Sequence, residues 1–127
     1  MPNLLTDSTS AVLTKALDGL SVRQQVIANN IANVETPGFT RSTVTFEDQL
    51  KQAMGSDDQS ATLNQVRGVR PQIQTDQVSP ARPDGNNVSI DQEMVDMNKT
   101  SLQYETVAQL MNMKIAMLKS AISEGKR

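Results

Sequence analysis

The 127-residue sequence contains no cysteine, no histidine and no tryptophan, and it has one tyrosine and two phenylalanines. The absence of cysteine excludes disulfide bonds and thiolate chemistry, although it does not settle the compartment, because many exported proteins also lack disulfides. The absence of histidine removes the side chain that most often acts as general base or metal ligand. Aromatic side chains bury the largest area per residue, so a chain with so few cannot build a large compact core from them.

Other missing features narrow the function further. The net charge is −2 with both signs scattered along the chain, so no basic patch indicates a nucleic-acid partner. We expect no cleaved secretory signal and no direct membrane insertion, because the N-terminus has no basic segment followed by an apolar one and no stretch approaches the roughly 20 apolar residues that span a bilayer. The acidic residues Asp91, Glu93 and Asp96 cluster at the expected start of a helix, where the helix dipole favours them. No nucleophile–base pair or phosphate loop is present, so we expect no enzyme, no catalytic or metal-binding residue and no cofactor.

Apolar side chains recur every seven residues at both ends of the chain, which predicts two long helices with coiled-coil-like seams. The first helix is expected over about residues 8–33, although Gly19 in its interior costs about 1 kcal/mol relative to alanine. Its packing positions are Leu13, Leu17, Leu20, Ile27 and Ile31. The second helix is expected over about residues 89–123, beginning at a cap such as Ser89. Its packing positions are Met94, Met97, Tyr104, Ala108, Met111, Ile115, Leu118 and Ile122.

The second helix carries a further apolar stripe away from this seam. The stripe consists of Val107, Leu110, Met113, Met117 and Ala121. Since one partner helix cannot cover both stripes, we expect additional neighbours from other copies of the chain or from other proteins. The alternative is that the middle of the chain folds back over the second stripe.

The chain therefore divides into an N-terminal helix (1–35), a middle segment (36–88) and a C-terminal helix (89–127). The middle segment holds four of the five prolines and four of the six glycines in a polar background. Its pattern predicts a short strand at 43–46, a helical turn or two at 46–54, a strand pair or extended arm at 66–78, and linkers at 55–60 and 79–85. Such low apolar content predicts a weakly folded unit that is mobile in the free subunit. The fold class is mainly α, with two long terminal helices forming an antiparallel coiled-coil-like pair and a small irregular or β-containing middle segment.

A forced chain reversal follows the first helix in the sequence NNIANVETPGF. Asn33 lies where the helix must stop and tolerates a left-handed conformation there. Pro37 and Gly38 fit the central positions of a type II turn, because proline fixes a negative φ and glycine accepts a positive one. The crowding of Asn29, Asn30 and Asn33 favours hydrogen bonds from their amides to neighbouring backbone, with contacts across subunits as one possibility, since buried asparagine needs partners for both its oxygen and its nitrogen.

The run from Ala28 to Phe39 resembles the N-terminal motif of bacterial flagellar rod and hook proteins. In that family an Asn-Asn-hydrophobic-Ala-Asn run precedes Thr-Pro-Gly-aromatic. The matching motif and turn residues here are Asn29, Asn30, Ile31, Ala32, Asn33, Thr36, Pro37, Gly38 and Phe39. The run from Asp84 to Met94 resembles the corresponding stretch of the small proximal rod proteins, and the short chain length agrees with that group.

The resemblance implies a structural subunit of the flagellar basal body that polymerises through its terminal helices into part of the drive shaft and export channel. Implied partners are further copies, other rod subunits, proteins at the junction of the rod base with the MS ring, and the flagellar type III export gate. The implied location is the periplasmic basal body, reached without a cleaved signal. The family also has a Phe-x-x-x-hydrophobic element read at the gate, which Phe46 and Leu50 match; as an i,i+4 pair they also fit simple helix packing. The alternative function is a soluble coiled-coil adaptor or export chaperone.

Overall fold

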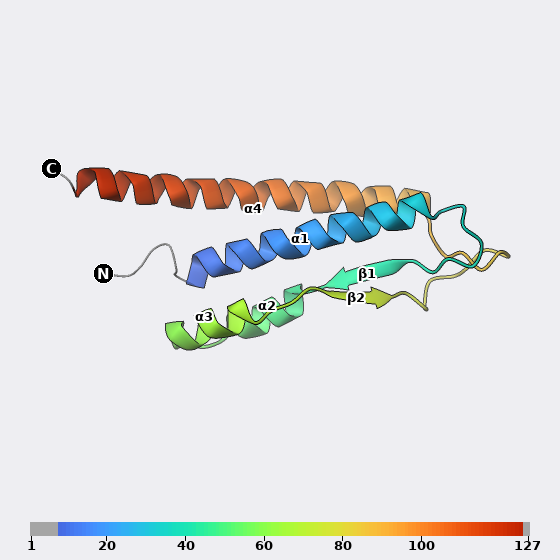
Figure 1. Ribbon diagram of the computed structural model, residues 1–127, viewed down its shortest axis with the longest axis horizontal. Helices are drawn as coiled ribbons and strands as arrows, with labels where there is room; N and C mark the ends of the chain where they lie inside the picture. Colours follow the sequence, from blue (N-terminus) through green and yellow to red (C-terminus); the bar gives the residue numbers. More distant parts are fainter. Residues whose placement is uncertain (1–7, 126–127) are drawn as a thin grey trace.

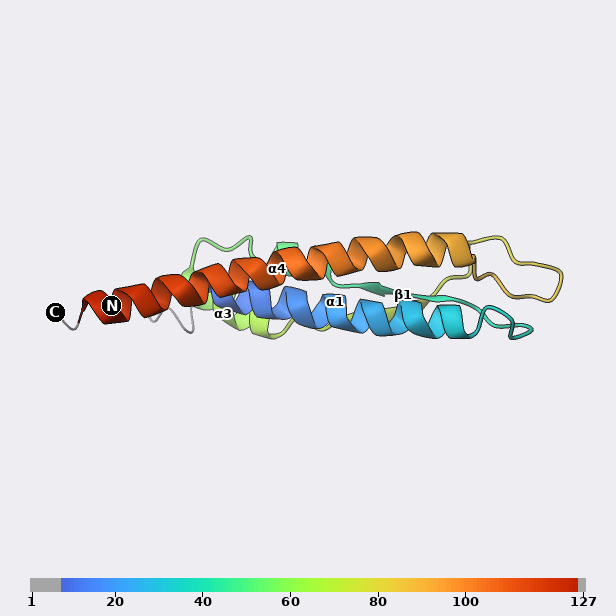
Figure 2. The same ribbon diagram turned by 90° about the horizontal axis from the view of Figure 1, so that it is seen from above.

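The computed structural model describes residues 8–125 of the 127-residue chain. Its elements follow in the order α1 (Ser8–Ala32), β1 (Ser42–Thr45), α2 (Glu47–Ala53), α3 (Gln59–Arg67), β2 (Gln72–Thr75) and α4 (Ile90–Glu124). The two long helices run side by side and antiparallel, and the middle elements pack mainly against α1, beside α4 (Figures 1 and 2). The predicted fold class is confirmed. No helix within residues 8–125 combines the length and apolarity needed to cross a membrane.

Both ends of α4 use ordinary capping chemistry. Ser89 precedes the helix with an extended backbone, and its side chain accepts a hydrogen bond from the Gln92 N–H, as expected of an N-cap. Asp91 and Glu93 lie in the first turn, where the helix dipole favours negative charge. Gly125 follows the last helical residue. The predicted boundaries of this helix are confirmed within one or two residues.

Two rows of α4 side chains face α1, and one of these rows begins one residue earlier in the sequence than the heptad pattern predicts. Met97, Tyr104, Met111 and Leu118 are half-buried as expected, but the second row is Glu93, Thr100, Val107 and Lys114. Met94, Ile115 and Ile122, which were expected in the seam, are exposed in the single chain. The physical reason is that Glu93 and Thr100 are buried polar residues, which a purely hydrophobic repeat assigns to the surface. A role of the three exposed residues in packing between subunits stays a prediction.

The middle segment contains a two-stranded sheet and two short helices. Strands β1 and β2 pair antiparallel, with Ser42 opposite Thr75 and Thr45 opposite Gln72. The predicted strand and the helical turns after it are confirmed, and one strand forms within 66–78. The prediction of a linker over 55–60 is wrong at its end, because Asp58 accepts a hydrogen bond from the Ser60 N–H at 3.0 Å and starts α3.

The hydrophobic core lies mainly between α1 and this middle segment. The core residues are Leu20, Val44, Phe46, Leu50, Ala53, Val66 and Val69. All of these residues except Leu20 come from the middle segment. The middle segment therefore packs into a hydrophobic core with α1, and the expectation that its low apolar content leaves it weakly packed is wrong. Its mobility in the free subunit stays a prediction.

Gly19 has a packing reason for its place in the interior of α1. The ring of Phe46 lies directly over it, so that a Cβ on residue 19 would come within 2.5 Å of the Phe46 Cδ1 atom. The guanidinium of Arg23 lies 5.0 Å from the centre of the same ring and donates a hydrogen bond to the Val44 carbonyl at 2.8 Å. Because Gly19 has no side chain, Phe46 at the start of α2 can approach the backbone of α1 closely.

Candidate functional site

The reversal after α1 has the predicted turn geometry. The Phe39 N–H donates to the Thr36 carbonyl at 3.2 Å, and Gly38 has φ of +73°. A hydrogen bond across four residues with a positive φ at the third defines the type II turn. The chemistry of Pro37 and Gly38 alone was sufficient to predict it.

The end of α1 is closed by side chains and not by a left-handed residue. Among residues 8–125 only glycines have a positive φ, so the expectation of a left-handed Asn33 is wrong. The Asn33 amide instead donates to the Asn29 carbonyl at 2.8 Å, and the Thr36 hydroxyl donates to the Asn33 Oδ1 atom at 3.1 Å. These side-chain bonds add to the backbone bond from the Asn33 N–H to the Asn29 carbonyl at 3.1 Å and tie the residues after α1 to its last turn.

Asn30 is completely buried and joins α1 to β1 and α4. Its Nδ2 donates to the Ser42 carbonyl at 2.8 Å, and its Oδ1 accepts from the Ser42 N–H at 3.0 Å. The same amide nitrogen donates to the Glu93 Oε2 atom at 3.2 Å. The Asn30 side-chain amide thus exchanges two hydrogen bonds with the backbone of Ser42 in β1, as a residue of a neighbouring strand would. All of these partners lie within the same chain, so the burial of Asn30 needs no contact from another subunit.

Arg41 connects three segments of the chain through ion pairs: its own, the turn at Asp76 and α4. Its Nε lies 2.6 Å from the Glu93 Oε1 atom and its Nη1 lies 2.6 Å from the Asp76 Oδ2 atom, while Asp96 lies 3.7 Å from Nη2. Burial alone would lower the pKa of Arg41, but hydrogen bonds to Glu93 and Asp76 outweigh it and raise that pKa. The guanidinium therefore stays charged and compensates the completely buried Glu93 carboxylate.

Asp76 is itself held by a tight turn. The Ser79 hydroxyl donates to it at 2.6 Å, and the N–H groups of Ser79 and Val78 donate at 3.0 and 2.9 Å. These bonds, led by the one from the Ser79 hydroxyl and joined by that from Arg41, hold the pKa of the Asp76 carboxyl far below its ordinary value.

The second motif segment, which begins at Asp84, lies against the first. Asn86 is completely buried, and its Nδ2 donates to the carbonyls of Asn33, Val34 and Thr36 at 2.9, 3.1 and 2.8 Å. The neighbouring Asn87 accepts from the Arg41 N–H and donates to the Asp76 carbonyl, both at 2.7 Å. The turn after α1 is thus fastened by residues some 50 positions further along the chain.

A second glycine allows these two segments to approach. Gly85 has φ of +86°, and a Cβ on it would lie 3.3 Å from the Gly38 Cα atom. The Gly38 N–H donates to the Asp84 carbonyl at 2.8 Å. The two segments that carry the family resemblance therefore form one structure. We call the polar residues that join these segments, together with Arg41 and Asp76 from outside them, the polar junction; its members are Asn30, Arg41, Asp76, Asn86, Asn87 and Glu93.

Comparisons with known proteins agree with these two segments. A sequence profile described as flagella basal body rod protein matches residues 12–40. The flagellar basal body rod protein FlgB of Borrelia hermsii is 41% identical over 103 residues, which cover 69% of this chain and 76% of the relative. The chain belongs to the FlgB family of flagellar basal body rod proteins.

Two more distant FlgB proteins match almost end to end. The protein of Bacillus subtilis (strain 168) is 29% identical over 120 residues, covering 90% of this chain and 92% of its own. The protein of Escherichia coli (strain K12) is 30% identical over 124 residues, covering 87% and 90%. Membership in the FlgB family makes the chain a structural protein of the basal body rod, and it does not favour the adaptor or chaperone alternative. The relatives are named as rod proteins and not as enzymes.

Most members of the polar junction were not identified as site residues from the FlgB-like sequence. Arg41, Asp76, Asn86, Asn87 and Glu93 were missed because their partners are distant in sequence. From the sequence, Glu93 is explained by its place at a helix start, where the dipole favours a carboxylate. A usable signal is present in the run Asp84 to Met94, where two adjacent asparagines, Asn86 and Asn87, directly follow Gly85.

The remaining motif residues lie outside the junction. Ile31 is half-buried, Ala32 is exposed, Phe39 is half-buried, and Asn29 and Pro37 are exposed. Among the predicted packing residues, Leu20 and Ile27 are buried, and the half-buried ones are Leu13, Leu17, Met97, Tyr104, Ala108, Met111 and Leu118. Phe46 and Leu50 are both buried in the core, so the packing interpretation describes them in the folded chain.

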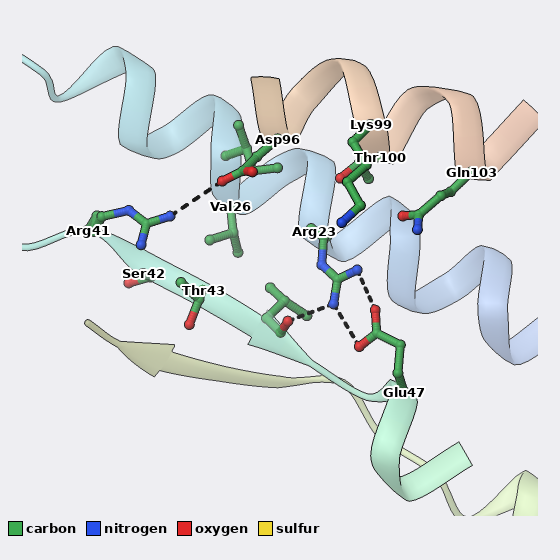
Figure 3. Close-up of a pocket in the computed structure, with 12 residues that line it drawn as sticks. Arg23, Val26, Arg41, Ser42, Thr43, Glu47, Asp96, Lys99, Thr100 and Gln103 are labelled. Carbon is green, nitrogen blue, oxygen red and sulfur yellow. Dashed lines mark hydrogen bonds and ion pairs between the residues drawn. The ribbon is translucent and has the colours of Figure 1, made fainter. Parts of the chain in front are cut away.

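A polar cleft of about 350 Å³ lies between α1, β1 and α4, close to the junction (Figure 3). Arg23 points across it to Glu47, with a hydrogen bond of 2.8 Å to Oε2. Burial would raise the pKa of Glu47, but the hydrogen bond from Arg23 outweighs it and lowers that pKa. Lys99 is the one charged residue lining the cleft without a hydrogen bond or ion pair to another described residue.

The carboxylates of this cleft take part in ion pairs with arginines. Each carboxylate that lines it is engaged by an arginine, so neither is placed as a free acid or base. Within the part of the chain that the structure describes, no group of three or more acidic residues is arranged to hold a metal ion. In this FlgB-family chain the polar junction therefore holds together α1, α4 and the segments that contain Arg41, Asp76 and Asn86.

Proposed function

We propose that the chain polymerises through α1 and α4, with further copies and with other rod subunits, into the proximal part of the flagellar rod. The polymer forms part of the drive shaft and encloses part of the export channel, and its first subunits meet proteins at the junction of the rod base with the MS ring. The subunit reaches the periplasm through the flagellar type III apparatus without a cleaved signal.

The exposed apolar surface of α4 carries this proposal. Large apolar side chains remain exposed along most of its length, namely Ile90, Met94, Val95, Leu102, Leu110, Met113, Ile115, Met117 and Ile122. Monomeric soluble proteins rarely leave apolar patches larger than roughly a few hundred Å² open to water, so this many exposed apolar side chains on one helix indicate a surface that partners cover. The middle segment lies against α1 and does not cover this surface. Neighbouring subunits are therefore the partners that bury it.

Single-cysteine variants test this polymerisation directly, since the sequence contains no cysteine of its own. Met117→Cys places a thiol on the exposed face of α4, and Ile73→Cys places one on the exposed strand β2 as a matched control. We expect maleimide to label both in the free subunit, and isolated basal bodies to protect residue 117 much more than residue 73. Absence of the wild-type chain from basal bodies, or equal labelling of residue 117 in both states, would refute the proposal.

The export gate is proposed to read Phe46 and Leu50 before the subunit folds. Both side chains are buried against α1 and its neighbours, so a folded subunit does not present them. We expect Phe46→Ala and Leu50→Ala to reduce export. Leu20→Ala is the matched control, because it weakens the same core but lies outside the Phe-x-x-x-Leu pattern. Equal export of all three variants would reduce Phe46 and Leu50 to packing residues.

A further inference from the structure

An apolar groove runs along one side of the α1–α4 pair. Its first part, of about 730 Å³, is lined by Ala16 and Leu20 of α1, Leu50 and Met54 at α2, and Leu102 and Val107 of α4. A second part of about 490 Å³ continues one helical turn further along both helices, from Leu13 on α1 and Leu110 on α4. We call the two parts together the helix groove.

The side chains at the mouth of the helix groove are apolar and accessible. Leu102 is 65% exposed, Met113 is 61% exposed and Met117 is 69% exposed. Leu20, beneath them on α1, is buried. The groove thus has a closed floor on α1 and an open mouth beside α4.

The charged residues along the helix groove are predominantly basic, although the whole chain has a net charge of −2. Lys51, Lys99 and Lys114 line it, and the one carboxylate among the lining residues, Glu47, is paired with Arg23. The side chains of Lys51 and Lys99 are exposed and form no hydrogen bond or ion pair with another described residue. An occupant that places carboxylates at the two edges of the groove would meet these ammonium groups.

The dimensions of the helix groove suit a helix. Its lining residues extend on α4 from Lys99 to Ala121, which at 1.5 Å per residue is about 33 Å. A groove between two packed helices accepts the side-chain ridge of a third. We propose that the helix groove binds one amphipathic helix of about six turns, with an apolar stripe flanked by Asp or Glu, from a different rod subunit. This inference rests on the proposed function.

The charge of the chain's own helices disfavours a second copy as the occupant. The part of α4 from Thr106 to Ser123 contains two lysines and no acidic residue. Helix α1 contains one aspartate, Asp18, against one lysine and one arginine. The acidic residues of α4 other than Glu124 lie before Thr106, so neither long helix offers an acidic-flanked apolar stripe over the full six turns to the lysines of another copy.

Two synthetic helical peptides test the occupant's chemistry on the full-length chain. Both have the same leucine stripe over six turns, and the flanks are glutamate in one and lysine in the other. We expect fluorescence anisotropy to show about ten-fold tighter binding of the glutamate peptide. The double variant Lys51→Glu, Lys99→Glu should remove or reverse this preference. Lys119→Glu, on the exposed outer side of α4 and outside the groove, is the matched control and should retain it.

Several outcomes would overturn this inference. Equal binding of the two peptides, no binding of the glutamate peptide, or the same response to the double variant and the control would each do so. Self-association of the free wild-type chain that the double variant abolishes would identify a second copy as the occupant instead. In cells, normal incorporation of the double variant into basal bodies overturns the groove inference alone, whereas absence of the wild-type chain from basal bodies overturns the proposed function.

Discussion

Replacing Gly19 with alanine sets two physical effects of opposite sign against each other. Alanine favours a helix interior over glycine by about 1 kcal/mol, so propensity alone predicts that Gly19→Ala stabilises α1. The new Cβ would lie 2.5, 2.6 and 2.7 Å from the Phe46 Cδ1, Cε1 and Cγ atoms. Since overpacking of a filled core costs typically about 1–3 kcal/mol, and three ring atoms clash here, we take the upper part of that range.

The expected net effect of Gly19→Ala is a loss of about 2 kcal/mol in the free energy of unfolding, or roughly 8 °C in Tm for a chain of this size. Urea unfolding followed by circular dichroism measures it. Gly68→Ala is the matched control, because Gly68 has φ of −82° and ordinary contacts around its Cβ position. That variant should be neutral or more stable by about 0.4–1 kcal/mol.

A double-mutant cycle isolates the contact between residues 19 and 46. In a Phe46→Leu background, which lacks the ring, Gly19→Ala should become neutral or stabilising. The coupling energy between the two sites should therefore be about 2–3 kcal/mol. A Gly19→Ala variant more stable than the wild type, or the same effect of the substitution in both backgrounds, would refute the close approach of the Phe46 ring to α1.

Three further substitutions test the polar junction and the turn. Asn30→Leu should lower the free energy of unfolding by roughly 2–4 kcal/mol in urea titrations, because it leaves the buried backbone groups of Ser42 without their Asn30 partners and removes one hydrogen bond to the Glu93 carboxylate. Asn29→Ala should cost less than about 1 kcal/mol, and similar losses for both variants would contradict the assigned burial. Gly38→Val should cost about 1–2 kcal/mol and impair rod assembly, because a β-branched residue resists a positive φ, and unchanged stability would mean that the turn is not type II. Asp76 has a folded-state pKa below its unfolded value of about 4, so its contribution to stability is present above that pH and is lost as the pH falls below it. The stability difference between the wild type and Asp76→Asn should therefore be constant above about pH 5 and shrink in acid, and a difference that does not change with pH would count against the bonded carboxylate.

Local chemistry was enough to predict the features whose cause is local. The turn at Pro37 and Gly38 follows from the φ preferences of two residues. Both long helices follow from the apolar repeat, and the cap at Ser89 follows from its hydroxyl. These features depend on residues at most a few positions apart, so the sequence shows cause and effect together.

The seam and the polar junction could not be predicted because their causes are distant in the chain. The burial of Glu93 depends on Asn30 and Arg41, which lie 63 and 52 positions earlier. A hydrophobic repeat cannot assign a carboxylate to a helix seam, so the pattern predicted Met94 at the seam position that Glu93 occupies. The core of the middle segment was missed for a related reason, since its few apolar residues become a core only when α1 supplies the opposing surface.

The structure changes which asparagine of the first motif is available to a neighbouring subunit. Asn30 is fully engaged with Ser42 and Glu93, and the Asn33 amide closes the end of its own helix. Asn29 is exposed, and within residues 8–125 its side chain takes part only in a long bond of 3.3 Å from Asn33. If the motif also serves contact between subunits, that contact falls to Asn29 and to the exposed Ala32 and Pro37, because the buried asparagines are already required to hold the turn to the rest of the chain.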